Sequence, residues 1–371
     1  MPNASLPTLG STTADVVVIG AGLVGLACAV AAADRGLDVL LFVDTRRGEA
    51  SPAAAGMLAP SVERATGLAH DFAVAARDRY PAYVAALGER TGVAVPLNTL
   101  GIIEVALDDA SADRARSQLA DGARWLDQSA LVALEPALAH AIGGTFHERD
   151  GAVNNLVLMR ALKHLVARHP HVRITNDVAT EVAYESAGVS VRTERGERHA
   201  AAQLVVAGGA WSPMIGGLPR SIPVTPVRGQ MLSVAGSPLR HVVYGPGGYV
   251  VPRGDGRTLL GATVEHVGFD ADTTPEGIQQ VRAAGAAICP PLGTARMLNA
   301  WAGLRPMSPD GLPILGRDPE RAAVVYACGH SRNGVLLAPL TGDRVADLLV
   351  AGPSAAAPAD LAPFAAARFV A

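Results

Sequence analysis

The chain has 371 residues, of which 49% are apolar, and its formal net charge at pH 7 is −3. This balance is typical of a globular chain with a sizeable core, and it argues against disorder, an acidic tail or a nucleic-acid partner. The only lysine is Lys163, on the polar side of an expected helix, so a pyridoxal-phosphate enzyme would have to form its Schiff base there.

The cysteines and the amino-terminal residues predict a cytoplasmic protein. Cys28, Cys289 and Cys328 are widely spaced and form no CxxC pair, which argues against a disulfide framework or a metal cluster. Residues 1–12 contain neither a basic start nor an apolar run, so no signal peptide is expected. Residues 16–33 carry no charge and are long enough for a membrane span, but their spaced glycines favour a buried strand followed by a helix.

The first predicted elements form a β-α-β unit. Residues 16–19 are β-branched without polar alternation, which predicts a strand buried on both faces of a parallel sheet. A glycine-rich turn leads into an alanine-rich helix that ends near Gly36. A second strand follows at residues 39–43.

The turn and the end of the second strand predict a dinucleotide site. Gly20 permits a tight turn, Gly22 lets the backbone approach a pyrophosphate, and Gly25 lets the helix pack closely on the sheet. Asp44 would accept hydrogen bonds from an adenosine ribose. This motif leaves FAD and NAD open. Two arginines that follow could favour the 2′-phosphate of NADP, although a surface pair is the simpler interpretation: Arg46 and Arg47.

The rest of the chain repeats strand-then-glycine units far apart in sequence. Residues 62–150 read as helices broken by a strand. Strands are expected at 101–105, 172–175, 203–207 and 323–327, an antiparallel sheet at 223–260, and a last helix at 335–349. The tail after Gly352 reads as a loose extension. The repeated units indicate one nucleotide domain interrupted by insertions.

Three motifs resemble those of glycine oxidases, the thiamine-pathway oxidases of the D-amino-acid oxidase group of flavoproteins: AAAGML at 53–58, WAGLRP at 301–306 and GHSRNGVLLAP at 329–339. The resemblance runs in order from about residue 15 to about residue 349. It implies an α/β fold in which an FAD-binding parallel-sheet (Rossmann-like) domain is interrupted by an α+β substrate domain with an antiparallel sheet. The expected FAD-binding domain comprises residues 1–80, 152–220 and 302–371, and the substrate domain residues 81–151 and 221–301.

The resemblance also implies which residues contact FAD. Along the pyrophosphate, ribose and adenine these are Gly20, Gly22, Leu23, Val24, Gly25, Asp44, Thr45 and, through its backbone, Val178. Along the ribityl chain and flavin they are Ala50, Ser51, Ala55, Gly56, Met57, His330, Ser331, Arg332, Asn333, Gly334, Val335 and Leu336. Val335 begins an expected helix, and the amino end of that helix would favour the negative charge of reduced flavin.

The flavin is expected to be noncovalent. Sarcosine oxidases of the same broader group attach theirs to a cysteine shortly after the position of Arg305 and Pro306, and residues 307–313 contain none. Cys328 comes later, after a strand, and is expected to pack as a small apolar residue.

A small amino acid is the implied substrate. Arg305 matches the family's carboxylate-binding arginine, which would form a bidentate charge-assisted pair. Arg332 matches a second substrate position, and Tyr249 matches the tyrosine that covers the substrate. The expected reaction is oxidative deamination of glycine, and of sarcosine or small D-amino acids, to glyoxylate or imine, ammonia and hydrogen peroxide, serving thiamine thiazole synthesis. We expect hydride transfer from Cα to flavin N5 without a protein general base, so no catalytic side chain is predicted.

Two alternatives remain open. One is a D-amino-acid or N-methyl-amino-acid dehydrogenase that uses an acceptor other than oxygen. The other is a non-catalytic flavin-binding sensor, which would need neither Arg305 nor Tyr249. The expected partners are a small amino acid and molecular oxygen, without nucleic acid, membrane or metal, and the resemblance suggests a homotetramer.

Overall fold

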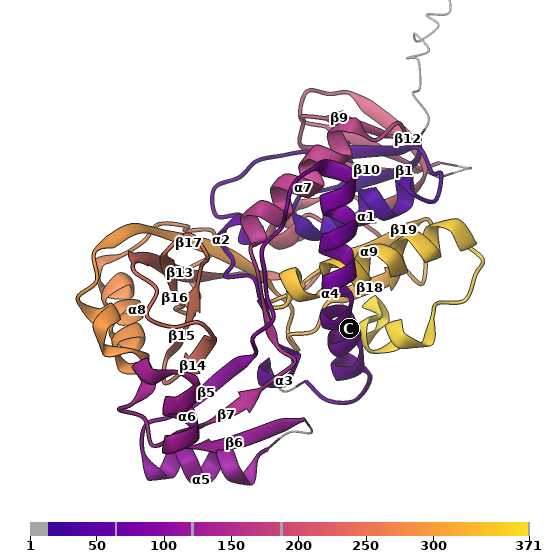
Figure 1. Cartoon of the computed structure of the whole chain (residues 1–371). Coiled ribbons are helices and arrows are strands. Elements are labelled where there is room, and N and C mark those ends of the chain that lie inside the picture. Colours follow the sequence, from indigo (N-terminus) through magenta and orange to yellow (C-terminus); the bar gives the residue numbers. More distant parts are fainter. Residues whose placement is uncertain (1–13, 64, 120–121, 186–187, 370–371) are drawn as a thin grey trace, which may run out of the picture.

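The computed structural model describes residues 14–63, 65–119, 122–185 and 188–369. Two large sheets dominate it, one mainly parallel and one mainly antiparallel. Figure 1 shows the parallel sheet with its helices on one side of the molecule and the antiparallel sheet on the other. The chain passes back and forth between the two domains.

The centre of the first sheet is parallel, in the order β9-β2-β1-β12-β19. Its strands are β1 (Ala14–Ile19), β2 (Val39–Phe42), β9 (Val172–Thr175), β12 (Arg198–Val206) and β19 (Val324–Cys328). Val17 pairs with Leu40 on one side and with Leu204 on the other. Val16 and Val18 pack into one apolar layer and Val17 into the opposite one. The predicted strand is therefore buried on both faces, which explains its lack of polar alternation.

Helices cover one face of this sheet: α1 (Leu23–Ala33), α4 (Gly67–Thr91), α7 (Asn155–Arg168) and α9 (Gly334–Ala351). Helix α1 packs directly on α9. Gly342 allows this approach, because a Cβ there would lie 2.7 Å from the backbone oxygen of Ala27. Since α1 follows β1 and α9 follows β19, both helices begin at the carboxyl edge of the sheet.

The opposite face carries an antiparallel extension of the sheet. It consists of the strands β10 (Ala179–Glu185) and β11 (Gly188–Thr193). The 3₁₀ helix η2 (Gly209–Met214) comes after β12 in the chain. Strand β18 (Ile314–Arg317) pairs antiparallel with β19. Apolar side chains of these elements pack against the central strands in a second core layer.

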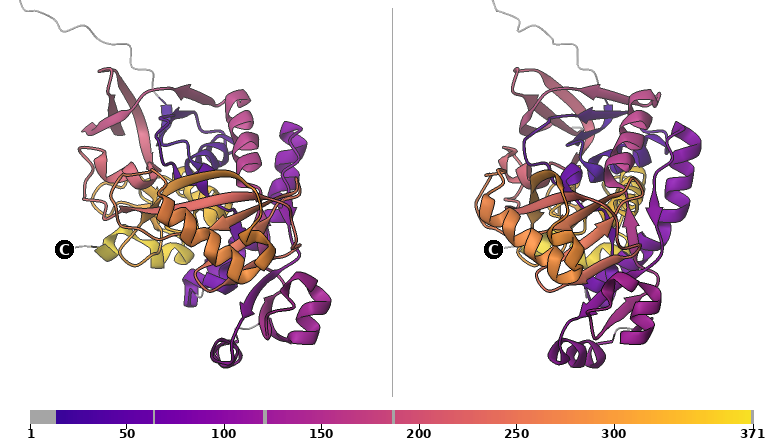
Figure 2. Two further views of the ribbon diagram at one scale, coloured as in Figure 1. Left: turned by 90° about the vertical axis from the view of Figure 1, so that its left-hand side faces the viewer. Right: turned by 60° about the vertical axis from the view of Figure 1, so that its left-hand side comes forward.

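The second sheet has the order β17-β13-β16-β15-β14-β5-β7-β6. Its strands are β5 (Ile102–Ala106), β6 (Ala123–Asp127), β7 (Gly143–His147), β13 (Thr225–Ala235), β14 (Val242–Gly245), β15 (Gly248–Pro252), β16 (Arg257–Gly261) and β17 (Met297–Met307). Helix α8 (Pro275–Ile288) lies across this second sheet, as Figure 2 shows. Helices α5 (Asp109–Ser117) and α6 (Gln128–Leu134) pack near β5 and β7. A short sheet of β3 (Met57–Leu58), β8 (Gly151–Val153) and β4 (Leu97–Asn98) completes the described strands.

The expected helices of residues 62–150 are only partly present. Helix α4 is there, but β6 and β7 form strands beside β5 where helices are expected. Strand β6 is short and lies at the edge of the sheet, so its sequence shows little alternation of apolar and polar residues. Strand β7 depends on close backbone approach, since a Cβ at Gly144 would lie 2.9 Å from the backbone oxygen of Glu104. Long-range pairing, which local patterns do not reveal, decides this region.

The tail after Gly352 is not a loose extension, and that expectation is wrong. Residues 359–364 form the 3₁₀ helix η4 (Ala359–Phe364). Phe364 is 1% exposed, and its ring lies 5.0 Å from that of Phe72 in an edge-to-face contact. Arg344 holds Asp360 by an ion pair of 2.6 Å. The tail is therefore part of the core beside α4 and α9.

The division of the chain into domains stays a prediction. Helix α4 runs unbroken through residue 80 and packs on α7 and α9. Strand β17 likewise runs through residues 301 and 302. The boundary between residues 151 and 152 lies inside β8, so three of the four expected boundaries fall within continuous elements.

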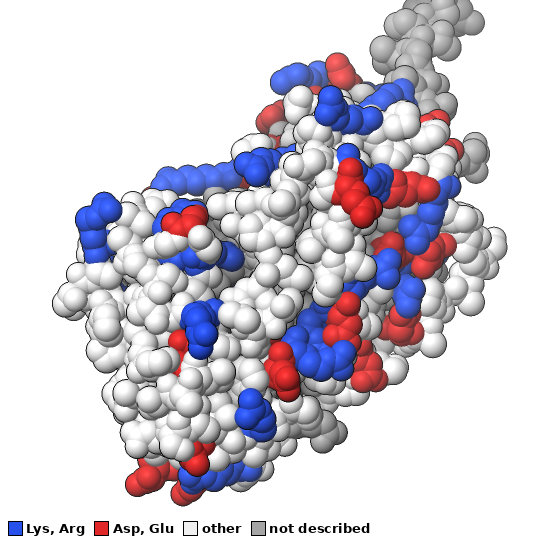
Figure 3. Space-filling view, viewed as in Figure 1, with Lys and Arg blue, Asp and Glu red and all other residues white. Residues whose placement is uncertain are grey.

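Charges are interspersed on the helical side of the molecule. Figure 3 shows acidic and basic side chains side by side over the face that carries α4 and α9. The ion pairs Arg35–Asp347 at 2.7 Å and Arg90–Asp34 at 2.6 Å contribute to this pattern. Among the described residues, no helix combines the length and the apolar composition that crossing a membrane requires.

The burial of the tail leads to a test of stability. Replacing Phe364 by Ala should lower the free energy of unfolding by roughly 3 kcal/mol, because the change removes a buried ring and leaves a cavity. Chemical denaturation followed by circular dichroism measures this difference. Ser354→Ala, at an exposed position of the same tail, should stay within about 0.5 kcal/mol of the parent. Equal stabilities of the two variants would contradict the packed tail.

Candidate functional site

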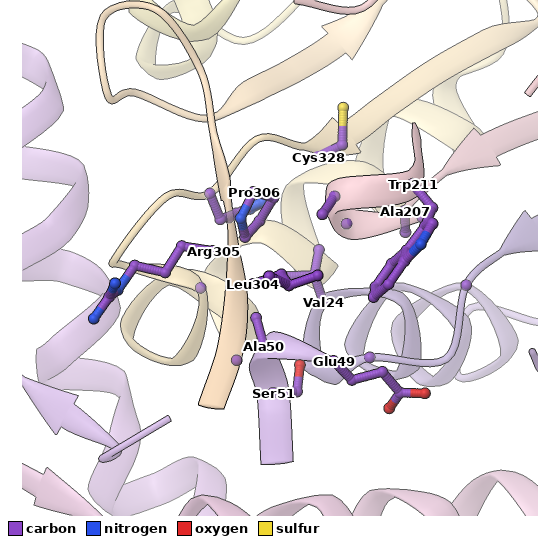
Figure 4. A pocket seen from close by; sticks show the side chains of 18 of the residues that line it. Val24, Glu49, Ala50, Ser51, Ala207, Trp211, Leu304, Arg305, Pro306 and Cys328 are labelled. Atoms are coloured by element: carbon purple, nitrogen blue, oxygen red, sulfur yellow. The ribbon is translucent and has the colours of Figure 1, made fainter. Parts of the chain in front are cut away.

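A cavity of about 390 Å³ lies between the two domains, at the carboxyl ends of the parallel strands. Residues that follow β1, β2, β12 and β19 form one wall, and β13, β15 and β17 contribute the other. Figure 4 shows Arg305 at one end of this cavity and Trp211 toward the other. The carboxyl edge of a parallel sheet is where α/β domains bind ligands, and the volume is in the usual range for such sites.

The glycine turn after β1 brings backbone to the cavity wall. Gly20 has a φ of +108°, and a Cβ there would lie 2.4 Å from the backbone oxygen of Ala207. A Cβ at Gly25 would lie 1.9 Å from the backbone oxygen of Gly20. The helix and the turn can therefore approach each other this closely only because residue 25 has no side chain. Gly22 lines the cavity at the amino end of α1, whose free N–H groups favour an anion. This cradle fits the pyrophosphate of a dinucleotide.

Asp44, the acidic residue after β2, lies in the cavity wall as predicted, and it already forms an ion pair within the chain. Asp44 forms an ion pair with Arg46, and the Arg46 guanidinium lies 5.6 Å from the centre of the Trp211 ring. Glu49 accepts a hydrogen bond of 2.9 Å from the backbone N–H of Arg46. Arg47 points away instead, with 76% of its side chain exposed, and pairs with Asp272. Only one of the two arginines therefore belongs to the cavity.

Val178 lies in the wall near this end, on the turn between β9 and β10. The preceding Asp177 is buried and accepts a hydrogen bond of 2.8 Å from the backbone N–H of Val178. Hydrogen bonds from Thr193 and from that N–H lower the pKa of the Asp177 carboxyl. Its second oxygen is buried without a partner among the described residues, which leaves an acceptor beside the cavity.

The segment after Asp44 crosses the middle of the cavity and is held from both domains, with Asn155 of the parallel-sheet side donating to the backbone oxygen of Ser51 at 2.8 Å. It forms the short helix α2 (Ala50–Ala53). The indole N–H of Trp301 donates to the backbone oxygen of Ala53 at 3.0 Å, and Arg253 donates to that of Ala55 at 2.8 Å. Gly303 allows the contact with β17, since a Cβ there would lie 2.4 Å from the Cβ of Ala53. The predicted residues of this segment that line the cavity are Ala50, Ser51, Ala55, Gly56 and Met57.

The loop before α9 forms a tight turn against β17. Ser331 has a φ of 51°, and its backbone N–H donates to the backbone oxygen of Pro306 at 3.0 Å. His330 is 3% exposed and lies 3.2 Å from the hydroxyl of Thr341 through Nε2. Burial lowers the pKa of His330 to about 3, so the imidazole is neutral at physiological pH. The loop thus presents backbone and a neutral ring next to the start of a helix.

The end of the cavity that lies in the substrate domain carries two guanidinium groups and a carboxylate. Arg305, on β17, donates to the backbone oxygen of Thr263 at 3.0 Å, and burial lowers its pKa. Gly229 makes room for it, since a Cβ there would lie 2.3 Å from its Nη2. Arg332 forms an ion pair of 3.3 Å with Glu63. Burial raises the pKa of Glu63, and the positive charges of Arg332 and Arg305 oppose that rise.

Most of the predicted site residues line this one cavity. They are Gly20, Gly22, Val24, Asp44, Ala50, Ser51, Ala55, Gly56, Met57, Val178, Tyr249, Arg305, His330, Ser331, Arg332, Asn333, Gly334 and Val335. Leu23 and Leu336 are instead core side chains, each 1% exposed, and Leu23 contributes its backbone N–H to the Ser51 hydroxyl at 3.0 Å. Gly25 acts through packing, and Thr45 lies in a neighbouring surface groove.

The prediction from sequence missed several residues of the cavity wall. Trp211 follows the strand-glycine unit at 203–210, so the repeat of that pattern could have indicated it. Glu63 lies on α3 (Pro60–Glu63), five residues after the AAAGML motif, and no local pattern marks it. Tyr244 adjoins the substrate end, with its ring 5.6 Å from that of Tyr249 and its hydroxyl buried without a partner among the described residues. Cys328 also lines the wall, buried as expected, and burial raises the pKa of its thiol to about 12.

The buried imidazole predicts a pH dependence of stability. Because the pKa of His330 falls from 6.5 to about 3 on folding, the unfolded chain binds the extra proton between these values. The contribution of His330 is therefore complete above pH 6.5 and is lost as the pH falls toward 3, by about 2 kcal/mol between pH 7.5 and pH 5. His330→Gln should remove that part of the pH dependence in urea denaturation at the two pH values. The same dependence in both proteins would argue against a neutral buried imidazole.

Comparison with known proteins agrees with this geometry. Residues 15–348 match the family model of FAD dependent oxidoreductases. The chain is 36% identical over 352 residues to a protein named bifunctional protein ThiO/ThiG from Synechocystis, covering 91% of this chain and 52% of that protein. It is 34% identical to a glycine oxidase from Geobacillus kaustophilus, covering 96% of this chain and 97% of that protein. The chain thus spans about half the length of the bifunctional relatives it matches.

Solved structures give the same result. The crystal structure of the glycine oxidase from Geobacillus kaustophilus superposes with a TM-score of 0.88 at 32% identity, covering 97% of this chain and all of that one. The α/β fold with an FAD-binding parallel-sheet domain and an antiparallel substrate domain is confirmed. The glycine turn, the acid after β2 and the helix that begins beside His330 fit FAD as the cofactor. The chain belongs to the family of FAD-dependent oxidoreductases that includes the glycine oxidases, as its motifs predict.

Proposed function

We propose that this protein oxidises the carbon–nitrogen bond of a small amino acid, with glycine as the first substrate and molecular oxygen as the electron acceptor. The observation that supports this most directly is Arg305. Its guanidinium is half-buried at the end of the cavity and forms no ion pair with a carboxylate of the described residues. A half-buried guanidinium in this state is a strong binding site for a substrate carboxylate.

The side chains around Arg305 hold and orient such a substrate. Arg305 is fixed by the backbone oxygens of Thr263 and Arg228, at 3.0 and 3.3 Å, so it does not need to be ordered when the carboxylate binds. Tyr249 covers the site from β15 and is 8% exposed, which excludes water.

No protein general base is part of the proposal. The acidic side chains in the described wall are Asp44, Glu49, Glu63 and Asp177. Asp44, Glu49 and Asp177 lie toward the Trp211 end, and Glu63 is engaged by Arg332. His330 is neutral and hydrogen-bonded to Thr341. FAD, when bound, supplies the chemistry by accepting a hydride from Cα and passing the electrons to oxygen.

The products of this proposal are glyoxylate, formed by hydrolysis of the imine, together with ammonia and hydrogen peroxide. Sarcosine and small D-amino acids are further candidate substrates, and thiamine thiazole synthesis is the process that the reaction would serve. The name ThiO/ThiG of one relative supports the link to thiamine synthesis, and the name glycine oxidase of another supports glycine as the substrate. A dehydrogenase with another electron acceptor would share the same substrate end, and a flavin-binding sensor would not need Arg305.

A peroxide assay in air separates these possibilities. With glycine, sarcosine and D-alanine as substrates, the proposal expects peroxide in proportion to substrate consumed. Loss of flavin colour without oxygen, but no peroxide in air, would instead indicate the dehydrogenase. A flavin that no amino acid reduces would indicate the sensor.

The carboxylate role of Arg305 is tested by substitution. Arg305→Ala should lower kcat/KM for glycine roughly 100-fold or more, mainly through KM, because a buried charge-assisted pair is lost. Bound FAD should remain, as measured by the flavin spectrum. Arg116→Ala, on the exposed surface of α5, is the matched control and should keep the parent kinetics. Parent-like kinetics in Arg305→Ala would remove the proposed role.

The attachment of the flavin has its own test. Cys328 lies in the cavity wall, but its thiol is fully buried and its pKa is raised to about 12, which disfavours the thiolate. We expect acid precipitation to release all of the yellow colour into the supernatant. Colour retained in the pellet of the parent and lost from that of Cys328→Ser would show a covalent bond at this residue.

A further inference from the structure

The substrate end of the cavity holds two positive charges and one negative charge from the described residues. Arg305 and Arg332 lie in its wall together with Glu63, and the three charges interact with one another. The two arginines differ in their partners. Arg332 is paired with Glu63 at 3.3 Å, whereas Arg305 donates to the backbone oxygens of Thr263 and Arg228. Only Arg305 therefore offers its full charge to a ligand.

The position of Glu63 is determined by the fold. Its helix, α3, is anchored by Asp150, which is 0% exposed. Asp150 accepts hydrogen bonds of 3.1 Å from both the backbone N–H and the hydroxyl of Ser61, and one of 2.8 Å from Arg77. The side chain of Glu63 is 19% exposed. The side chain of Arg332 is 46% exposed, so the ion pair is in contact with solvent and its geometry depends on the anchoring of α3.

The charge balance then matches one class of substrate. The sum of the three side-chain charges is +1, which complements an amino acid whose amine is neutral and whose only charge is one carboxylate. A second substrate carboxylate would approach Arg332 only by meeting Glu63, and two carboxylates in a partly buried site repel each other. Without the charge of Glu63, Arg332 would be free to bind that second group.

We propose that Glu63 restricts this site to amino acids with a single carboxylate, by occupying the guanidinium that would otherwise bind a second one. Glu63 is thus a specificity-determining residue, and this role deepens the proposed function and rests on it. Glu63 acts on the choice of substrate through Arg332, and it takes no part in the transfer of the hydride.

A matched pair of substrates isolates the effect. Sarcosine carries a methyl group on the amine where iminodiacetate carries a carboxymethyl group, so the two differ by one carboxylate. In the FAD-loaded enzyme, Glu63→Gln keeps the shape of the side chain and removes its charge. The ratio of kcat/KM for iminodiacetate to that for sarcosine should rise roughly 10-fold to 100-fold, the range expected for one charge-assisted contact.

Three further variants test whether the charge of Glu63 and the guanidinium of Arg332 are the cause. Glu63→Asp keeps the charge and should leave the ratio close to that of the parent. The double variant Glu63→Gln with Arg332→Gln should lose the gain, because the freed guanidinium is gone. Glu89→Gln removes one charge at an exposed position of α4 and should leave the ratio unchanged. A gain that survives in the double variant would overturn the proposal.

Binding of unreactive anions provides a readout that does not depend on turnover. Glycolate and diglycolate, with one and two carboxylates, can be titrated against the flavin absorbance of the loaded protein. Diglycolate should gain at least about 10-fold in affinity relative to glycolate in Glu63→Gln. If the parent does not oxidise glycine but this shift appears, the proposed function fails and the charge role stands. If glycine is oxidised and neither ratio changes, the specificity role of Glu63 is wrong.

Discussion

The packing of α1 against α9 on one face of the parallel sheet is the constraint on which the site depends. Because Gly342 has no side chain, the backbone of α9 approaches the backbone of α1 closely at Ala27. The two helices therefore form one layer. Both start where a strand ends, and their amino ends therefore meet the same cavity. One end provides the cradle for phosphate, and the other provides positive potential beside His330.

The cavity also depends on how each charge in its wall is balanced. At the Trp211 end, Asp44 pairs with Arg46, and Glu49 binds the backbone of the same arginine. At the other end the balance is left incomplete, because Arg305 is surrounded by neutral acceptors. Taking a cation out of water without an anion has a cost, and burial lowers the pKa of Arg305 accordingly. A bound carboxylate would remove that cost, which makes an anionic ligand the natural complement of this end.

The parts of the site that sequence analysis found share one property: their geometry is local. The turn from Gly20 to Gly25 needs glycines because backbone atoms lie within a few ångströms of it, and a short motif records this. Glu63 was missed because its role comes from a contact with Arg332, which is far away in the sequence. Glu63 meets Arg332 only because α3 is anchored through Asp150. Thr45 and Leu336 show a limit of short motifs. Each is next to a cavity residue in the sequence, but neither lines the cavity itself.

The sequence by itself determined the parallel sheet and the dinucleotide turn, since strand burial and close backbone approach leave marks in neighbouring residues, and its motifs determined the family. Only the tertiary structure decided that β6 and β7 extend the second sheet, that the tail packs through Phe364 on Phe72, and that Arg332 is engaged by Glu63. The physical reason is the range of the interaction. Strand pairing, core packing and ion pairs join residues distant along the chain, and no local pattern specifies the partner.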